Sequence, residues 1–368
     1  MDGRSICIIL TDPIKVFEQK GEIKSGYYNP QNYFEKVILI SFTSQEARLE
    51  VIRTVVGSAE VSVFPVGEIK IFNFFNILIR IFNIVRKNKP SVLRAYDPSF
   101  RGIISVLIGK LLKIPVVISL HLEFDDQRKF DKRLLLRLRM ILERISIRSA
   151  DSVICVTDYV KRYALRYGAK RAVTIYNGVN IGQFNISRNK TMLGGNLVLS
   201  VGRLAPQKYQ ECLIRAVAFL DAELILIGDG CLFEDLHALT IKLGVENKVK
   251  FIRAVPNREI HRYFEMAKVF AIATHYEGFC IPIIEAMAAG LPIVASNLEV
   301  ISEIMDGCGY LCENNPADFK RVIELLINNP GLRNELGQKA RERAHIFDSA
   351  GLKKKEKEAY ENICKLYA

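Results

Sequence analysis

Residues 269–295 combine a buried strand, a loop, a helix and a second strand, and this order constrains the fold more than any other stretch. The apolar run at its start predicts a buried strand, which breaks at Glu277 and Gly278. Pro282 suits the first turn of a helix, where its missing N–H costs little. Gly290 ends that helix, and another apolar run follows. Loop N–H groups and a helix N-terminus would then face one crevice, which suits a phosphate.

The same alternation of apolar runs and amphipathic segments repeats along the chain. The predicted strands are residues 5–10, 37–41, 61–66, 91–95, 115–120, 151–156, 197–201, 223–227, 249–252, 269–273 and 291–295. The predicted helices begin near residues 44 and 282 and cover 73–88, 99–112, 128–148, 257–266 and 349–366. Strands that alternate with helices indicate an α/β protein with doubly wound parallel sheets.

The chain is long enough, at 368 residues, for two domains with cores of their own. Residues 173–180 contain an Asn-Gly turn signal, and the polar residues 185–196 read as a connector. We therefore expect an N-terminal domain over 1–176, a second domain over 177–345 and a final helical segment over 346–368.

The charge is uneven along the chain. The net charge is +12, and residues 1–170 hold 28 Lys and Arg against 17 Asp and Glu, a net +11. Most of this excess lies in residues 80–148, which hold 16 Lys and Arg against 6 Asp and Glu. This excess indicates an anionic partner: membrane lipid, a phosphate-bearing acceptor or nucleic acid. The basic amphipathic pattern of 128–148 suits an anionic membrane face; the alternative is a core-packed helix with a solvated basic face.

The cysteines and the hydropathy pattern bear on location. Eight cysteines are scattered, and Cys308 and Cys312 form a lone C-x3-C pair without a second pair. Most of the cysteines should be small buried hydrophobes in a reducing compartment. Neither a leader pattern nor an apolar run of about 18 residues is visible. We expect a cytoplasmic protein, peripheral at the inner face of the membrane.

Two carboxylates and two cations could bind one ligand. Glu277 and Glu285 lie eight apart, one in the loop and one in the helix of the opening stretch. A carboxylate accepts two hydroxyl hydrogen bonds, which suits the hydroxyl-rich ends of a nucleotide sugar. Arg203 and Lys208 follow the strand 197–201 and could neutralise a diphosphate. The alternatives are two solvated glutamates on an ordinary strand–helix–strand unit and two surface cations.

The opening stretch resembles the donor-binding motif of glycosyltransferase family 4. The matching residues are Glu277, Gly278, Phe279, Pro282, Glu285, Ala286, Ala288, Gly290 and Pro292. Cys280 stands where the family usually has glycine, and we expect a local adjustment that leaves its N–H exposed. Gly202-Arg203-Leu204 with Lys208, and Gly228-Asp229-Gly230, also resemble family segments.

The resemblance implies a GT-B fold, in which two Rossmann-like doubly wound domains face a central cleft and the last helix crosses back to the first domain. It implies that Glu285 binds the ribose, that Glu277 contacts the sugar as a catalytic residue, and that Arg203 and Lys208 bind the diphosphate. It further implies donor contacts from the loop of Gly278, Phe279 and Cys280 and from Gly230. His121 would face the reacting sugar as the second catalytic residue; a capping or core histidine is the alternative. We expect no metal and no cofactor.

The implied activity is that of a retaining, metal-independent hexosyltransferase. It would move a sugar from a nucleotide-diphosphate sugar to a hydroxyl acceptor, such as a lipid-linked or cell-envelope glycan, at an anionic membrane surface. We expect no nucleic-acid partner. Two alternatives remain open. One is a basic membrane- or nucleic-acid-binding protein with a transferase-like fold, and the other is a different GT-B nucleotide-sugar enzyme, such as a 2-epimerase.

Overall fold

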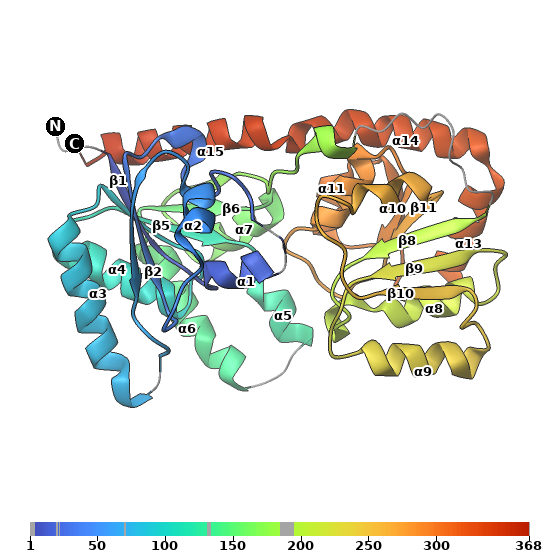
Figure 1. The fold of residues 1–368 in the computed structure, drawn as a ribbon, viewed down its shortest axis with the longest axis horizontal. Helices are drawn as coiled ribbons and strands as arrows, with labels where there is room; N and C mark the ends of the chain where they lie inside the picture. Colours follow the sequence, from blue (N-terminus) through green and yellow to red (C-terminus); the bar gives the residue numbers. More distant parts are fainter. Residues whose placement is uncertain are drawn as a thin grey trace. The chain divides into compact units, whose positions relative to one another are not determined.

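The chain divides into two α/β units in a computed structural model (Figure 1). Unit 1 comprises residues 1–176 and 352–368, and unit 2 comprises residues 177–351. The residues that the structure describes are 4–19, 21, 23–69, 71–130, 134–184 and 195–367.

Unit 1 is built on a parallel sheet. Among the described residues its strand order is β3-β2-β1-β4-β5-β6-β7. The strands are β1 (Ser5–Ile9), β2 (Lys36–Ser41), β3 (Glu60–Pro65), β4 (Val92–Ala95), β5 (Val116–Leu120), β6 (Ser152–Cys155) and β7 (Ala172–Thr174). The strand order reverses direction between β1 and β4, which is the pattern of a doubly wound sheet.

Helices connect the strands of unit 1. They are α1 (Ile14–Gln19), α2 (Leu49–Val56), α3 (Phe74–Asn88), α4 (Phe100–Leu112), α5 (Phe124–Phe130), α6 (Leu134–Ser149) and α7 (Asp158–Arg166), with short 3-10 turns η1 (Pro30–Asn32) and η2 (Ile71–Asn73). The last helix, α15 (Ser349–Lys365), packs Tyr360 against Phe34 of unit 1, with 5.0 Å between the ring centroids.

The prediction of one basic helix over 128–148 is wrong, because the structure has α5 and α6 there. The Arg128 side chain on α5 donates to Glu143 on α6 at 2.6 Å. In one straight helix these residues would lie about 22 Å apart along the axis, so this contact requires the chain to turn. Residues 131–133, at that turn in sequence, lie outside the described residues.

Unit 2 repeats the architecture with a parallel sheet of its own. The described strands follow the order β10-β9-β8-β11-β12-β13. They are β8 (Leu197–Val201), β9 (Glu223–Ile227), β10 (Val249–Ile252), β11 (Val269–Ile272), β12 (Ile293–Ser296) and β13 (Gly309–Cys312). Its switch point lies between β8 and β11, which are neighbours in the sheet although β9 and β10 separate them in sequence.

The helices of unit 2 cover this sheet. They are α8 (Gln210–Val217), α9 (Phe233–Leu243), α10 (His261–Met266), α11 (Ile281–Ala288), α12 (Glu299–Met305), α13 (Pro316–Asn328) and α14 (Pro330–Ala344), with 3-10 turns η3 (Ile181–Phe184), η4 (Pro206–Lys208) and η5 (His345–Phe347). The predicted strands and the helix after Pro282 are present, which confirms the doubly wound α/β class.

Several boundaries differ from the sequence prediction. The helix expected near residue 44 begins at Leu49, and the helix expected from 257 begins at His261. The connector predicted over 185–196 falls largely on residues 185–194, which lie outside the described residues. These differences are local and leave the strand order unchanged.

Candidate active site

The predicted donor residues gather at the switch point of the unit 2 sheet. The loop after β8 carries Arg203 and Lys208, and the loop after β11 carries Glu277. Neighbouring parallel strands whose connections leave in opposite directions open a crevice at their carboxyl ends, and ligands of such sheets bind there. The sequence therefore places both cations and the carboxylate at the ligand-binding edge of the sheet.

Lys208 and Glu277 form a buried ion pair. The Lys208 ammonium donates to the Glu277 carboxylate, and the two side chains are 13% and 4% exposed. Burial works to lower the pKa of Lys208, but the Glu277 charge and hydrogen bond outweigh it, so the pKa is raised. Lys208 therefore stays charged, and its charge lies next to the carboxylate that the sequence singled out.

Gln207 fixes the two loops against each other. Its side-chain amide donates to the Tyr276 carbonyl at 2.7 Å, and its own carbonyl accepts from the His275 N–H at 2.8 Å and from the Thr274 hydroxyl at 3.0 Å. These bonds hold the residues that precede Lys208 and Glu277 in register. Sequence reasoning missed Gln207, because a lone glutamine carries no motif signal; its place directly before Lys208 was the available cue.

Arg203 lies near this pair on the loop after β8. Its side chain is exposed, and its backbone carbonyl accepts from the Gln210 side chain at 2.7 Å. The Arg203 charge acts against the charged form of Lys208 and is one of the causes that lower the pKa of Lys208. Two cations thus lie close enough to interact, which is an arrangement that a diphosphate would stabilise.

Glycines let the loops after β8 and β9 approach each other. A Cβ at Gly228 would lie 2.1 Å from the Gly202 carbonyl oxygen, and a Cβ at Gly230 would lie 2.2 Å from the Leu204 carbonyl oxygen. The Leu204 N–H donates to the Asp229 carbonyl at 3.0 Å. Gly230 therefore supports the loop that carries Arg203 through close backbone packing.

The loop before α11 brings the remaining predicted residues together. Gly278 and Cys280 are buried, and Phe279 is half-buried with its ring 6.1 Å from that of Phe347. Cys280 precedes the first helical residue of α11, and Glu285 lies one turn into that helix. The helix therefore starts at Ile281, four residues after Glu277, at the end of the loop that the opening stretch predicts.

Cys280 is an inert thiol in this setting. Burial, then the Glu277 charge, raises its pKa to about 12, and Glu285 also contributes to the rise. A thiol with such a pKa stays protonated and is a poor nucleophile. Both carboxylates thus act on the thiol that lies directly before α11.

A polar network lies behind the loop. The Thr274 N–H donates to the Ser296 hydroxyl at 2.8 Å, Ser296 donates to the Asn314 side chain at 2.5 Å, and Asn314 donates to the Thr274 carbonyl at 2.8 Å. Thr274 and Ser296 are fully buried. This closed set of hydrogen bonds fixes the end of β11, from which Glu277 projects.

His121 belongs to unit 1, directly after β5. Its ring stacks on Tyr96 at 5.7 Å, and its Nε2 is buried without a hydrogen-bond partner among the described residues. Burial, together with the nearby Arg94 charge, lowers the pKa of His121 to about 4. The imidazole is therefore neutral near pH 7, with one buried nitrogen able to take a ligand hydrogen bond.

Arg94 organises the surroundings of His121. Its guanidinium donates to Ser119 at 3.0 Å, to Tyr360 at 2.5 Å and to Glu356 on α15, and it lies 4.3 Å from the centre of the Tyr96 ring. The aromatic stack and the cation thus fix the ring on which His121 packs. The sequence analysis missed Arg94 because a single arginine inside a strand gave no motif signal.

The described residues also bear on metal binding and on membrane insertion. They contain no group of three or more His, Cys, Asp or Glu side chains placed to hold a metal ion. The helices within the described ranges are also too short or too polar to cross a membrane.

Comparison with known proteins supports the resemblance. The model for glycosyl transferases group 1 matches residues 183–343, and the model for glycosyltransferase family 4 matches residues 35–183. An uncharacterised glycosyltransferase of Methanocaldococcus jannaschii is 28% identical over 294 residues, which are 78% of this chain and 81% of that protein.

Two further relatives extend the comparison. A Campylobacter jejuni protein named GalNAc-alpha-(1->4)-GalNAc-alpha-(1->3)-diNAcBac-PP-undecaprenol alpha-1,4-N-acetyl-D-galactosaminyltransferase is 26% identical and covers 77% of this chain and 78% of that protein. The structure of Anabaena HepE in complex with UDP and glucose superposes with a TM-score of 0.77 at 18% identity, covering 97% of this chain and 99% of that chain.

These matches agree with the two parallel sheets and with the motifs of unit 2. The likeness to HepE shows the GT-B fold, and the two family models together span most of both units. The chain therefore belongs to glycosyltransferase family 4, the group 1 glycosyltransferases that act on nucleotide sugars.

Proposed function

We propose that this chain is a retaining, metal-independent glycosyltransferase that moves a sugar from a nucleotide-diphosphate sugar to a hydroxyl of a lipid-linked or cell-envelope glycan. The observation that carries the donor assignment is the buried Lys208–Glu277 pair, with Arg203 beside it, at the switch point of the unit 2 sheet. In this proposal Glu285 binds the ribose, and Gly230 and the loop of Gly278, Phe279 and Cys280 shape the site.

The chemistry proposed for the donor site follows from its charges. The acceptor oxygen attacks the anomeric carbon while the bond from that carbon to the phosphate oxygen breaks, and the acceptor proton passes to the leaving phosphate. Negative charge develops on that phosphate, and Arg203 and Lys208 would stabilise it. With two cations available, the reaction needs no metal ion for this role.

Glu277 and His121 are the proposed catalytic residues. Glu277 would accept hydroxyl hydrogen bonds from the transferred sugar while it stays paired with Lys208. His121 would contact the sugar as a neutral imidazole through its unpartnered Nε2. Attack from the face that the phosphate leaves retains the anomeric configuration, so the mechanism requires no second nucleophilic carboxylate.

The proposed acceptor draws on the relatives and on the charge of unit 1. The Campylobacter jejuni relative is named for a diphospho-undecaprenol-linked acceptor, and the net charge over residues 1–170 is +11. An acceptor that is anchored in an anionic leaflet would suit such a surface. We therefore propose a cytoplasmic location at the inner face of the membrane.

The test is a transfer assay with a panel of nucleotide sugars and lipid-linked oligosaccharide acceptors. NMR of the product should show the same anomeric configuration as the donor, and a chelator should leave the rate unchanged. An inverted product would contradict retention, and activity that is lost to the chelator and restored by one divalent ion would contradict metal independence.

A further inference from the structure

The segment η2–α3 of unit 1, whose helix α3 is labelled in Figure 1, carries large apolar side chains that are exposed. Phe72, Phe75 and Ile79 are 82%, 72% and 58% exposed, and they lie within two helical turns. Other side chains of the helix, such as Ile81 and Val85, are buried and hold it on the unit. Three large apolar groups that face water so close together are typical of a surface that meets a partner.

The same helix carries cations that no carboxylate neutralises. Arg80, Arg86 and Lys87 are exposed, and none of them forms an ion pair within the described ranges of the chain. The sequence contains no Asp or Glu between Glu68 and Asp97. The surface formed by Phe72, Phe75, Ile79, Arg80, Arg86 and Lys87, here named the α3 surface, is therefore both apolar and positive.

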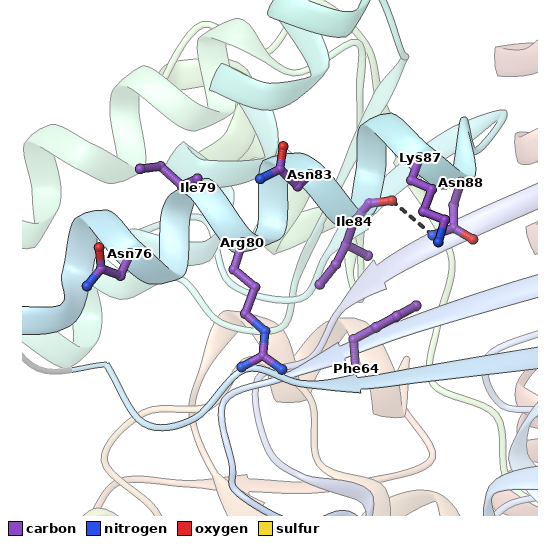
Figure 2. Close-up of a pocket in the computed structure, with 8 residues that line it drawn as sticks. All are labelled: Phe64, Asn76, Ile79, Arg80, Asn83, Ile84, Lys87 and Asn88. Atoms are coloured by element: carbon purple, nitrogen blue, oxygen red, sulfur yellow. Dashed lines mark hydrogen bonds between the residues drawn. The ribbon is translucent and has the colours of Figure 1, made fainter.

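A groove with both apolar and polar lining residues runs along this helix. It has a volume of about 480 Å³ and lies between α3 and the edge strand β3. Figure 2 shows Arg80 extending from the helix toward the strand that carries Phe64. Its lining residues are Phe64, Asn76, Ile79, Arg80, Asn83, Ile84, Lys87 and Asn88. Two cations and several amides give the groove hydrogen-bond donors that suit a phosphate.

Several cations of α5 and α6, by contrast, make contacts inside unit 1. Arg128 donates to Glu143 and Asp125, and its side chain is 10% exposed. Arg139 donates to the Ser99 hydroxyl at 3.0 Å, and Arg144 lies 4.8 Å from the centre of the Tyr167 ring. Arg133 and the side chain of Arg137 lie outside what the structure describes. Arg128 and Arg139 therefore have side-chain hydrogen bonds inside unit 1. In the described part of the chain Arg80 and Lys87 of α3 have none, and Arg86 only lies 5.7 Å from the centre of the Phe82 ring.

We propose that the α3 surface docks unit 1 on a bilayer that contains anionic phospholipid. Phe72, Phe75 and Ile79 enter the interface between headgroups and acyl chains, while Arg80, Arg86 and Lys87 face the headgroup phosphates. Charge complementarity and the exposed apolar side chains argue for this occupant. This inference names the surface through which the protein of the proposed function would contact the membrane. It rests on the proposed function only in assuming that the acceptor lies in that membrane.

The test is co-sedimentation of the full chain with vesicles. The wild type should bind vesicles of phosphatidylcholine with phosphatidylglycerol, should be released by salt, and should not bind vesicles of phosphatidylcholine alone. Arg86→Gln with Lys87→Gln should weaken binding roughly thirtyfold, because each cation near an anionic leaflet contributes about a factor of five. Phe72→Ser with Phe75→Ser should weaken it at least about tenfold.

Matched controls separate the α3 surface from general effects. Phe219→Ser removes an apolar side chain of unit 2 that is 75% exposed. Arg144→Gln with Arg148→Gln removes two positive charges from α6, as many as Arg86→Gln with Lys87→Gln removes from α3. Both controls should bind vesicles within about twofold of the wild type. Binding that is lost equally in the α6 variant, or kept in both α3 variants, would overturn the proposal.

Other occupants give other outcomes. Absence of binding to anionic vesicles, or equal binding to neutral ones, overturns the proposal. A wild-type dimer in sedimentation velocity that the Phe72→Ser, Phe75→Ser variant abolishes would assign the surface to a second copy instead. Calorimetry with UDP and GDP as probes should give the same affinity for the wild type and the α3 variants. Nucleotide binding thus tests the proposed donor site, and vesicle binding tests the α3 surface independently.

Discussion

Lys208 and Arg203 are both cations of the predicted donor site, but they differ in how much the fold depends on them. Lys208 is nearly buried against Glu277, which is 4% exposed, whereas Arg203 is exposed. Removing one member of a buried pair leaves the other charge uncompensated. In the proposed function Lys208 would therefore serve both the fold and the donor site, while Arg203 would serve the site alone.

The Lys208→Met variant should lose stability and nucleotide affinity together. We expect a loss of about 3–5 kcal/mol in the free energy of unfolding of unit 2, because Glu277 is left buried without its cation. Urea unfolding measures this quantity. Arg203→Gln is the control and should change stability by no more than about 0.5 kcal/mol. A stability loss in Lys208→Met that is as small as the one expected for Arg203→Gln would show that the Lys208–Glu277 pair is unimportant for the fold.

His121 should make the stability of unit 1 depend on pH. Its pKa is lowered to about 4, below the value of about 6.5 in an unfolded chain. The folded state therefore binds the proton more weakly than the unfolded chain does. The stabilisation is complete above pH 6.5 and is lost as the pH falls toward 4, by about 3 kcal/mol in total.

The His121→Gln variant tests this dependence. Glutamine does not titrate, so the variant lacks this pH dependence. As the pH falls from 7.5 to 4.5, the unfolding free energy of the wild type should therefore fall relative to that of the variant. Urea unfolding at these two pH values measures it. A difference that stays constant with pH would show that His121 titrates alike in the folded and unfolded chain.

At the scale of elements, the close packing of the loops after β8 and β9 depends on Gly230. The Gly230→Ala variant would place a Cβ 2.2 Å from the Leu204 carbonyl, so the loop that carries Arg203 must move. We expect a loss of about 1–3 kcal/mol in stability and at least about tenfold weaker binding of a nucleoside diphosphate.

Gly244→Ala is the matched control for that variant. Gly244 also has a positive φ, but a Cβ there meets no atom within 4 Å. It should cost only the backbone strain of about 1 kcal/mol and leave nucleotide binding unchanged. Thermal unfolding and calorimetry measure the two effects, and an unchanged nucleotide affinity in Gly230→Ala would remove this glycine from the site.

The elements that could be predicted from the sequence are those with a strong local pattern. Continuous apolar runs gave β8 and β11, and Pro282 and Gly290 marked α11. The break between α5 and α6 could not be predicted, because the periodicity of 128–148 continues across it and the Arg128–Glu143 contact is tertiary. β13 carries no comparable apolar run and was missed.

The candidate site shows the same division between local and tertiary information. Glu277, Lys208 and Arg203 follow strands and carry motif signals, so the sequence brings them to one edge of the sheet. Gln207 and Arg94 matter through partners that are distant in the chain, such as Tyr276 and Glu356. A single sequence gives no local sign of such partners, since they depend on how the loops pack.

At the scale of the whole molecule, the excess positive charge and the proposed donor site lie in different units. The cationic excess lies in residues 1–170, whereas the remainder of the chain is nearly neutral and carries the Lys208–Glu277 site. Loss of vesicle binding and loss of nucleotide binding should therefore be separable by mutation. A variant of the α3 surface should affect the first, and a variant of Lys208 should affect the second.

Calorimetric titration of nucleoside diphosphates into the full chain tests the central claim, a donor site in unit 2, most directly. We predict that one of UDP, GDP, ADP or dTDP binds the wild type and that Arg203→Gln, which should fold normally, binds it roughly ten- to a hundredfold more weakly. Glu285→Gln should also weaken binding through the ribose. An affinity unchanged in both variants, or no binding of any of the four by the wild type, would contradict the account.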